Sequence, residues 1–415
     1  MPRVLSMRER AQVTRKALRK RLDTLLPKAM READLDMWLV LCQEDDYDPI
    51  FKTMVPMDSW CPILQMLIFY DRGDEAGVER VNLSRTGLGD LYDSPWNGAR
   101  DDEQWPLFTK IIQERDPRRI GLNIGDVQWA AGGLTQNLYR QIVAALPKGF
   151  ADRLVSAERA ATRWAATLID EEIATFEHVV AVAHEILARC YSRDGIVPGV
   201  TTTEDLEWLY WQQCAGLGLD VSFKPFFMLV RSDENRERHG ADDRVIRHGD
   251  FVRSDVGIKY IGLNSDHQQW CYVLRPGETD APEGARHLMR EANRLQDIYM
   301  SEFRHGLTGN EMLSNILTRA RAEGLPEPRV YSHSLGHFLH EPGPLIGLPW
   351  EQERCVGRGD VALEYGNAFT MELSVRGPLP EWGGQSVGMG LEEDVIFTES
   401  GCRAVDGRQT EFYLV

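Results

Sequence analysis

The chain has 415 residues, of which 43% are hydrophobic and 27% charged, and its formal net charge at pH 7 is −17. This composition is that of an ordinary globular protein, and the length is sufficient for two domains. The acidic balance argues against nucleic acid as a partner, because phosphate backbones require an excess of clustered lysine and arginine. No apolar run reaches the roughly 18 residues that a membrane span needs, so we expect a cytoplasmic protein with no membrane partner.

The pattern of apolar residues predicts two domains. Residues 1–165 alternate helical patterns with short apolar runs, which is typical of an α/β domain. Near residue 168 apolar residues begin to recur at helical spacing, and this change predicts a long helix that opens a second domain, residues 166–415. All ten histidines follow residue 165. We therefore expect any metal chemistry in the second domain.

Two aspartates, Asp255 and Asp266, lie in a stretch of β-branched, aromatic and glycine residues that predicts strand structure. On one straight strand they would be roughly 36 Å apart and would face opposite sides. A hairpin that turns between Lys259 and Leu263 would instead bring both carboxylates to one space. Buried carboxylates without partners are costly, so this arrangement implies a cation.

The second domain also contains an internal repeat. Residues 199–206 (GVTTTEDL) resemble residues 306–313 (GLTGNEML). Each copy predicts a Thr-x-x-Glu capping box that starts a helix, one at Thr201 and one at Thr308.

The repeat extends to the carboxylates. In each copy a glycine lies six residues before a carboxylate in a predicted strand, Asp255 in the first copy and Glu372 in the second. A further carboxylate follows each of these, Asp266 and Glu393. Two copies related by an approximate twofold axis would bring the four carboxylates to a shared centre.

Three histidines lie between the second capping box and Glu372, in the segment YSHSLGHFLHEPGP: His333, His337 and His340. Carboxylates with one or two imidazoles suit divalent manganese, cobalt, iron or zinc, and two such ions would neutralise four carboxylates. Two ions about 3.5–4 Å apart can share a water and lower its pKa toward neutrality. The reaction class that follows is metal-assisted hydrolysis.

These residues resemble those of the pita-bread metallopeptidase family, which includes methionine aminopeptidase, aminopeptidase P and prolidase. The resemblance implies a creatinase-like N-terminal domain, a duplicated catalytic fold, a homodimer and two divalent ions, with manganese favoured. In this resemblance Asp266 and Glu393 bridge the metals, and Glu372 also accepts a proton. The implied metal ligands are Asp255 in SDVG, Asp266 in NSD, His337 in SLGH, Glu372 in TMELS and Glu393 in EEDVIFTESG.

The sequence departs from the pattern of prolyl-specific members in three places. Residues 267–270 read His-Gln-Gln-Trp where a Thr-Arg-Thr type segment is usual, and Leu391 replaces an arginine two positions before the last glutamate. A second histidine usually follows the ligand histidine by seven residues, whereas His340 follows His337 by three. Catalytic roles are assigned to His239, His340 and Glu372, and substrate contacts to His333 and Trp270.

Three functions remain open on this reading. The first is a dinuclear-metal peptidase that hydrolyses the N-terminal peptide bond of peptides or dipeptides, of Xaa-Pro type. The second is a hydrolase or lyase for a small nitrogenous metabolite, because the segment that departs from the prolyl-specific pattern adjoins the predicted ligands. The third is a catalytically silent binding protein, which the retained ligand set disfavours.

Overall fold

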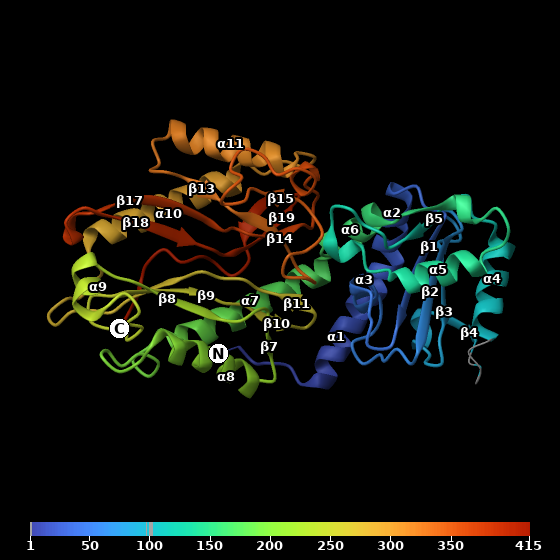
Figure 1. Cartoon of the computed structure of the whole chain (residues 1–415), viewed down its shortest axis with the longest axis horizontal. Helices are drawn as coiled ribbons and strands as arrows, with labels where there is room; N and C mark the ends of the chain where they lie inside the picture. The colour runs from blue at the N-terminus through green and yellow to red at the C-terminus, as the bar shows by residue number, and fades with distance from the viewer. Residues whose placement is uncertain (1, 97, 99–102) are drawn as a thin grey trace. The chain divides into compact units, whose positions relative to one another are not determined.

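The computed structural model describes residues 2–96, 98 and 103–415. They form two compact units, one comprising Leu5–Ile169 and the other built on Asp170–Val415. Both units combine helices and strands (Figure 1), so the predicted mixed α/β class is confirmed. Within the described ranges, no helix is long and apolar enough to cross a membrane.

The N-terminal unit is built on a mixed sheet of six strands in the order β4-β3-β2-β1-β5-β6. Its central strands β1 and β2 are nearly continuous apolar runs and are buried along most of their length, as expected for inner strands covered by helices. The strands are β1 Met37–Gln43, β2 Leu64–Asp71, β3 Val78–Leu83, β4 Asp93–Trp96, β5 Ile120–Leu122 and β6 Leu154–Ser156. The α-helices are α1 Met7–Lys20, α2 Leu26–Glu32, α3 Pro49–Met54, α4 Gln104–Arg115, α5 Gln136–Ala145 and α6 Glu158–Ala166.

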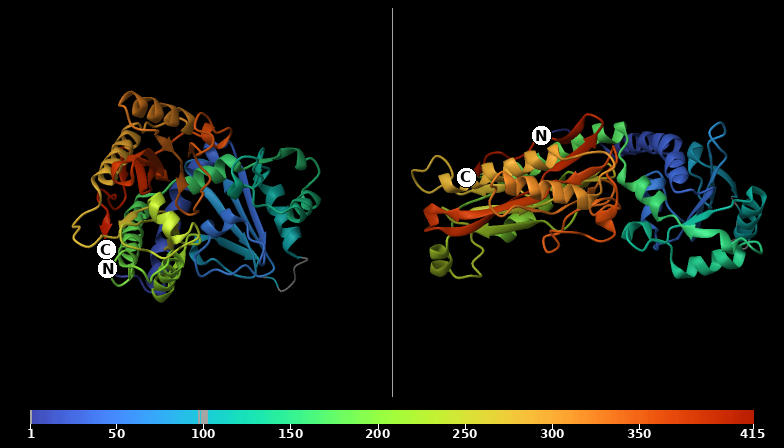
Figure 2. Two further views of the ribbon diagram at one scale, coloured as in Figure 1. Left: turned by 60° about the vertical axis from the view of Figure 1, so that its left-hand side comes forward. Right: turned by 90° about the horizontal axis from the view of Figure 1, so that it is seen from above.

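In the C-terminal unit the strands lie between the helix pair α7 and α8 and the helix pair α10 and α11 (Figures 1 and 2). Its helices are α7 Asp170–Cys190, α8 Thr203–Gly216, α9 Asp233–His239, α10 Glu283–Ser301 and α11 Gly309–Ala322. Its strands are β7 Asp220–Val221, β8 Phe226–Val230, β9 Phe251–Asp255, β10 Ile258–Tyr260, β11 Leu263–Asn264, β12 Trp270–Tyr272, β13 Arg329–Val330, β14 Ser332–Leu335, β15 Leu345–Ile346, β16 Ala368–Thr370, β17 Leu373–Leu379, β18 Gln385–Leu391, β19 Asp394–Thr398, β20 Gly401–Ala404 and β21 Tyr413–Leu414.

The two halves of this unit share backbone geometry at matched glycines. Gly199 and Gly306, which precede α8 and α11, have φ of +83° and +86°. Gly249 and Gly366, which precede β9 and β16, have φ of +86° and +87°. These values lie in the left-handed region that only glycine adopts without strain. The backbone therefore repeats at the positions where the sequence repeats.

The helix caps agree with the sequence prediction in one copy and differ in the other. Thr308 and Glu311 form the predicted capping box of α11. In α8 the box is formed one residue later than predicted, by Thr202 and Asp205. The hydroxyl of Thr201 instead accepts a hydrogen bond from the backbone of Val197, 2.9 Å away, and so is engaged in the preceding turn.

The predicted hairpin between the two aspartates is present. Strands β10 and β11 pair antiparallel, and the chain reverses at Ile261 and Gly262, both with positive φ. The flanking strands β9 and β12 continue the same register, with Arg253 opposite Trp270. Because a two-residue step restores the side-chain direction, this register places Asp255 and Asp266 on one face.

The hairpin predicts a contrast between two glycines. At Gly257 a Cβ atom would overlap the backbone oxygen of Ser265, which cannot move without breaking the pairing, whereas a Cβ at Gly262 would meet open space. We expect Gly257→Ala to cost roughly 3 kcal/mol of unfolding free energy. Gly262→Ala should cost about 1 kcal/mol through its positive φ alone. Urea denaturation of both variants checks this, and equal costs would contradict the register described.

Candidate metal centre

A row of side chains crosses four adjacent chain segments of the C-terminal unit. The register of β9 with β12 sets Asp255 opposite Gln268. Gln268 pairs through its backbone with Glu392. The registers on either side of Glu392, Thr370 with Asp394 and Leu373 with Leu391, set Glu392 opposite Glu372. Directly opposed residues of antiparallel strands project to the same face, so this row presents three carboxylates and one amide together.

Two more groups join this face. Asp266 lies two residues before Gln268 and therefore points to the same side. His333 in β14 is likewise on the face of Glu372, because it lies opposite Thr370, whose hydroxyl accepts from the His333 backbone at 3.4 Å. The ligand atoms of Asp266, His333 and Glu392 all lie within 4.8 Å of one another.

The amide of Gln268 connects the outer two carboxylates of the row. Its nitrogen donates to Glu372 at 2.8 Å and to Asp255 at 3.3 Å. The guanidinium of Arg253 donates to the other end of the same amide, which fixes its orientation. The charge of Arg253 lowers the pKa values of Asp255 and Glu372, but the effect of burial is larger and both pKa values stay raised.

The centre of the cluster is buried and short of hydrogen-bond donors. Asp266, Glu392 and His333 are 5%, 1% and 2% exposed. One carboxylate oxygen of Asp266 and both oxygens of Glu392 make no hydrogen bond. Leaving a buried carboxylate unpaired costs several kcal/mol, so these oxygens are arranged for a positive charge that the side chains themselves do not supply.

The pKa values follow from this crowding of acids. Burial raises the pKa of Asp255 to about 6 and that of Glu372 to about 7. Burial and the neighbouring carboxylates raise the pKa values of Asp266 and Glu392 well above their ordinary range. Burial also lowers the pKa of His333 to about 3, which keeps its imidazole neutral, as a metal ligand must be.

The residues present fit divalent cations. Four carboxylates and one neutral imidazole form an oxygen-rich donor set with one nitrogen, which suits hard to borderline divalent ions. Two such ions would balance the four negative charges. They would also satisfy the carboxylate oxygens of Asp266 and Glu392 that lack hydrogen bonds.

Two predicted ligands do not reach this cluster. Glu393 is one residue away from Glu392, and since side chains alternate along extended chain it points to the opposite side. There it accepts from His184 at 3.0 Å and from Gln269 at 2.8 Å. His337 lies beyond the end of β14, and its imidazole contacts Glu172 of α7 at 3.1 Å. The geometry brings Glu392 and His333 to the cluster in their place.

This revised set also removes one departure from the family pattern. His340 follows His333 by seven residues, the usual spacing of the second histidine. The two imidazole rings are 4.4 Å apart, and His340 is exposed while His333 is buried. The seven-residue spacing was the sequence feature that could have identified His333 as the ligand.

The other predicted site residues lie elsewhere. Trp270 is 1% exposed, packs its ring against Phe251 and donates its indole N–H to the Gly390 carbonyl, so it belongs to the core and not to a substrate surface. His239 lies exposed at the C-terminal end of α9. Gln268, which sequence reasoning did not single out as a site residue, lies within the carboxylate row.

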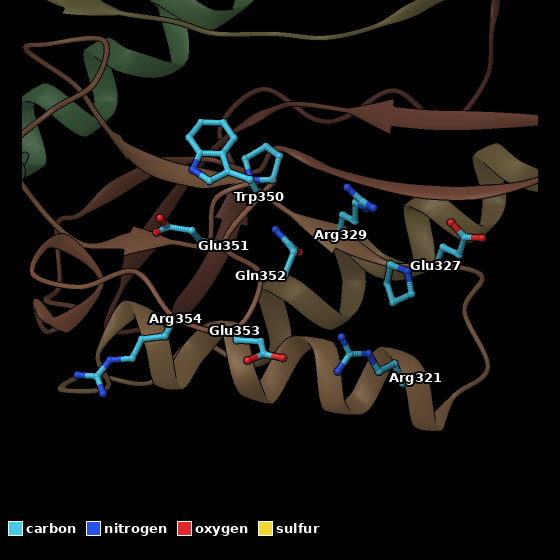
Figure 3. Close-up of a pocket in the computed structure, with 10 residues that line it drawn as sticks. Arg321, Glu327, Arg329, Trp350, Glu351, Gln352, Glu353 and Arg354 are labelled. Carbon is cyan, nitrogen blue, oxygen red and sulfur yellow. The ribbon is translucent and has the colours of Figure 1, made fainter.

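A hollow of about 670 Å³ lies at the end of α11 and the loop after β15 (Figure 3). Trp350, at 74% exposure, stands at its edge. Its lining, all within the described part of the chain, contains none of the predicted site residues. It is lined by Arg321, Glu327, Pro328, Arg329, Pro349, Trp350, Glu351, Gln352, Glu353 and Arg354.

The sequence profile of metallopeptidase family M24 matches residues 174–399, more than half of the chain. This chain belongs to metallopeptidase family M24. An uncharacterized peptidase, YqhT of Bacillus subtilis, is 26% identical over 59% of this chain and 63% of its own length. The probable dipeptidase PepE of Mycobacterium tuberculosis is 29% identical over 43% of this chain and 42% of its own length. The match thus spans less than two thirds of either relative.

Solved structures share the fold over nearly the whole chain. The X-Pro aminopeptidase of Thermotoga maritima covers 94% of this M24 chain and 100% of its own, at 18% identity and a TM-score of 0.67. The Xaa-Pro dipeptidase of Bacillus anthracis covers 98% and 100%, at 18% identity and a TM-score of 0.61. The N-terminal domain of the FACT complex subunit SPT16 of chickpea covers 95% and 97%, at 12% identity and a TM-score of 0.60. At these identities the likeness shows the two-domain pita-bread fold alone.

The raised pKa values predict how the metal-free protein responds to pH. Asp255 and Glu372 bind protons more tightly when folded than when unfolded, so their contribution to stability is present at low pH and is lost as pH rises from about 4 to about 7. The metal-free protein should therefore melt at a lower temperature at pH 7.5 than at pH 5.5. The corresponding loss in unfolding free energy should be on the order of a few kcal/mol.

Thermal melts with and without chelator measure this effect. Added divalent metal should abolish the loss, because the cation replaces the protons. In the metal-free double variant Asp255→Asn/Glu372→Gln the fall should be smaller, since the amides do not ionise. A metal-free protein that is equally stable at both pH values would contradict the crowding of carboxylates.

Proposed function

We propose that this protein is a dinuclear-metal-dependent peptidase that hydrolyses the N-terminal peptide bond of peptides or dipeptides with proline in the second position. The observation that carries the proposal is the row of buried carboxylates, above all the two Glu392 oxygens without a hydrogen-bond donor. Asp255, Asp266, His333, Glu372 and Glu392 are the five proposed ligands. Bound divalent ions would supply Lewis-acid polarisation of the scissile carbonyl and activation of a water.

The proposed ligands differ in their positions within the cluster. Asp266 and Glu392 occupy the buried centre of the cluster, with His333 beside them, and can serve both ions. Asp255 and Glu372 lie at opposite ends of the row, separated by the Gln268 amide. Each end carboxylate therefore serves one side of the site.

Glu372 is the proposed proton acceptor. This is the role that the family resemblance implies for it, in addition to metal binding. The 2.8 Å hydrogen bond from Gln268 fixes the orientation of its carboxylate. His340, exposed next to His333, is the group placed to contact a substrate that approaches the metals.

The Xaa-Pro preference rests on the relatives and on the restored histidine spacing. The structural neighbours from Thermotoga maritima and Bacillus anthracis act on X-Pro or Xaa-Pro substrates according to their names, and PepE is described as a probable dipeptidase. Manganese as the native ion, homodimeric assembly and a cytoplasmic location stay predictions from the family resemblance.

A second candidate is a hydrolase or lyase of a small nitrogenous metabolite. One observation favours it: Gln268 places a neutral amide among the carboxylates. This amide belongs to the segment that departs from the Thr-Arg-Thr type pattern of prolyl-specific members. Such a change beside the reaction centre alters the groups that a substrate meets.

Histidine variants test which imidazole serves the metals. His333→Ala should lower kcat/KM at least about 100-fold. Removing even an outer hydrogen-bond partner of a metal ligand lowers metal affinity or activity about 10–100-fold. His337→Ala, the matched control four residues away, should keep activity near that of the unaltered protein, because its side chain contacts Glu172 instead. Assays after reconstitution with manganese measure both, and the reverse result would restore His337 as the ligand.

A substrate panel tests the reaction itself. The manganese-loaded protein should release the N-terminal residue from Xaa-Pro dipeptides and longer peptides, and much more slowly from matched Xaa-Ala substrates. Activity should disappear in Asp266→Ala, which loses a central ligand. Hydrolysis of small amides or amidines with none of peptides would select the second candidate.

A further inference from the structure

A second cluster of metal-ligand side chains lies behind the carboxylate row. His267 follows Asp266 and Glu393 follows Glu392, and adjacent residues of extended chain face opposite sides. Each segment that directs a carboxylate to the front cluster therefore directs its next side chain to the rear. Helix α7, which packs beside β10 and β11, adds His184 to this rear side.

The rear side chains converge on one oxygen. Oε2 of Glu393 lies 3.0 Å from Nε2 of His184 and 3.4 Å from Nδ1 of His267. The three ligand atoms lie within 4.8 Å of one another, and the two imidazole rings are 4.5 Å apart. Ligands at about 2.0–2.2 Å in a tetrahedron are separated from one another by roughly 3.3–3.6 Å, so the 3.0 and 3.4 Å separations are close to those around a single ion.

Each imidazole is backed by a second carboxylate. Nδ1 of His184 is 3.0 Å from Asp406, and Nε2 of His267 is 3.5 Å from Asp394. A metal-binding histidine usually presents its other ring nitrogen to a carboxylate, which fixes the ring and raises its basicity. His184 has this hydrogen bond, and Nε2 of His267 faces Asp394 in the same sense without a hydrogen bond of good geometry.

The other oxygen of Glu393 is fixed independently. It accepts from the side-chain amide of Gln269 and from the backbone N–H of Gln409, both at 2.8 Å. The first oxygen is thus left to face the two imidazoles. Glu393 and His184 are therefore each oriented by a group outside the cluster.

His267 shows why hydrogen bonding alone does not complete this cluster. It is 1% exposed, and neither of its ring nitrogens makes a hydrogen bond of good geometry, although each faces a carboxylate oxygen. A neutral imidazole carries one N–H, so one ring nitrogen presents a lone pair to an oxygen. A cation between Nδ1 and Glu393 would engage this lone pair, with the N–H on Nε2 directed at Asp394.

We propose that His184, His267 and Glu393 form a separate site for one divalent cation of the zinc class, distinct from the front pair. Two imidazoles and a carboxylate are a ligand set that zinc takes in proteins, with a fourth position left for water. The site joins α7 to the two segments that carry Asp266 and Glu392. Its role is to hold those front ligands in position, and it does not depend on the peptidase activity.

The test uses the full chain with the front cluster disabled. The triple variant Asp255→Asn/His333→Ala/Glu372→Gln removes front ligands that are not adjacent to the rear ones. After chelation and equilibrium dialysis it should retain one Zn²⁺ or Co²⁺ per chain, and Co²⁺ should give the intense visible bands of a tetrahedral site. Adding His184→Gln should abolish both the bound ion and the bands.

Two further variants keep the result interpretable. His178→Gln, on the same helix, is the matched control and should leave the retained ion unchanged, because His178 contacts Tyr260. Asp406→Asn in the triple variant should weaken Zn²⁺ binding about 10–100-fold without removing it. Zn²⁺ should also raise the melting temperature of the triple variant but not of its His184→Gln derivative.

Three outcomes would overturn the proposal. The triple variant could fold, by circular dichroism, and bind no Zn²⁺ or Co²⁺, in which case protons alone hold the rear cluster together. The retained ion could survive His184→Gln. Both variants could also gain the same thermal stability from Zn²⁺, which would place that ion elsewhere.

Discussion

The C-terminal unit depends on one electrostatic constraint: four carboxylates and an imidazole share one buried face without enough donors to satisfy them. The strands present Asp266 and Glu392 at the centre, where several of their oxygens lack any hydrogen bond. Such an arrangement is stable only with protons or cations. The same constraint raises the pKa values of Asp255 and Glu372, because a bound proton removes a buried negative charge.

The fold alone does not decide what this face does. Proteins of this fold include the named peptidases and also a FACT complex subunit, at similar TM-scores. A fold hosts several functions, and catalysis depends on the side chains of the site. Here the complete set of metal-ligand side chains on one face supports the peptidase, while Gln268 marks where the substrate side differs from the prolyl-specific pattern.

Much of the fold could be predicted from the sequence, but the site only in part. Strand composition and the glycine-bearing turn predicted the hairpin, and the parity of that hairpin brings Asp255 and Asp266 to one face. The second half is arranged in the same way, but β17 and β18 lie between Glu372 and Glu392. This long insertion makes the register between the two glutamates hard to predict from the sequence. Since neighbouring residues face opposite sides, an error of one residue exchanged Glu393 for Glu392. Whether His333 or His337 is the ligand was ambiguous for a similar reason, because only the strand pairing shows that His333 lies on the ligand face.

In the proposed function, a pair of divalent ions is held by Asp255, Asp266, His333, Glu372 and Glu392. Anomalous diffraction from crystals grown with manganese tests it most directly. We expect two neighbouring manganese peaks on the front face, among the side chains of Asp255, Asp266, His333, Glu372 and Glu392, with Asp266 and Glu392 at the centre. Front peaks ligated by His337, or no manganese between these carboxylates, would contradict it.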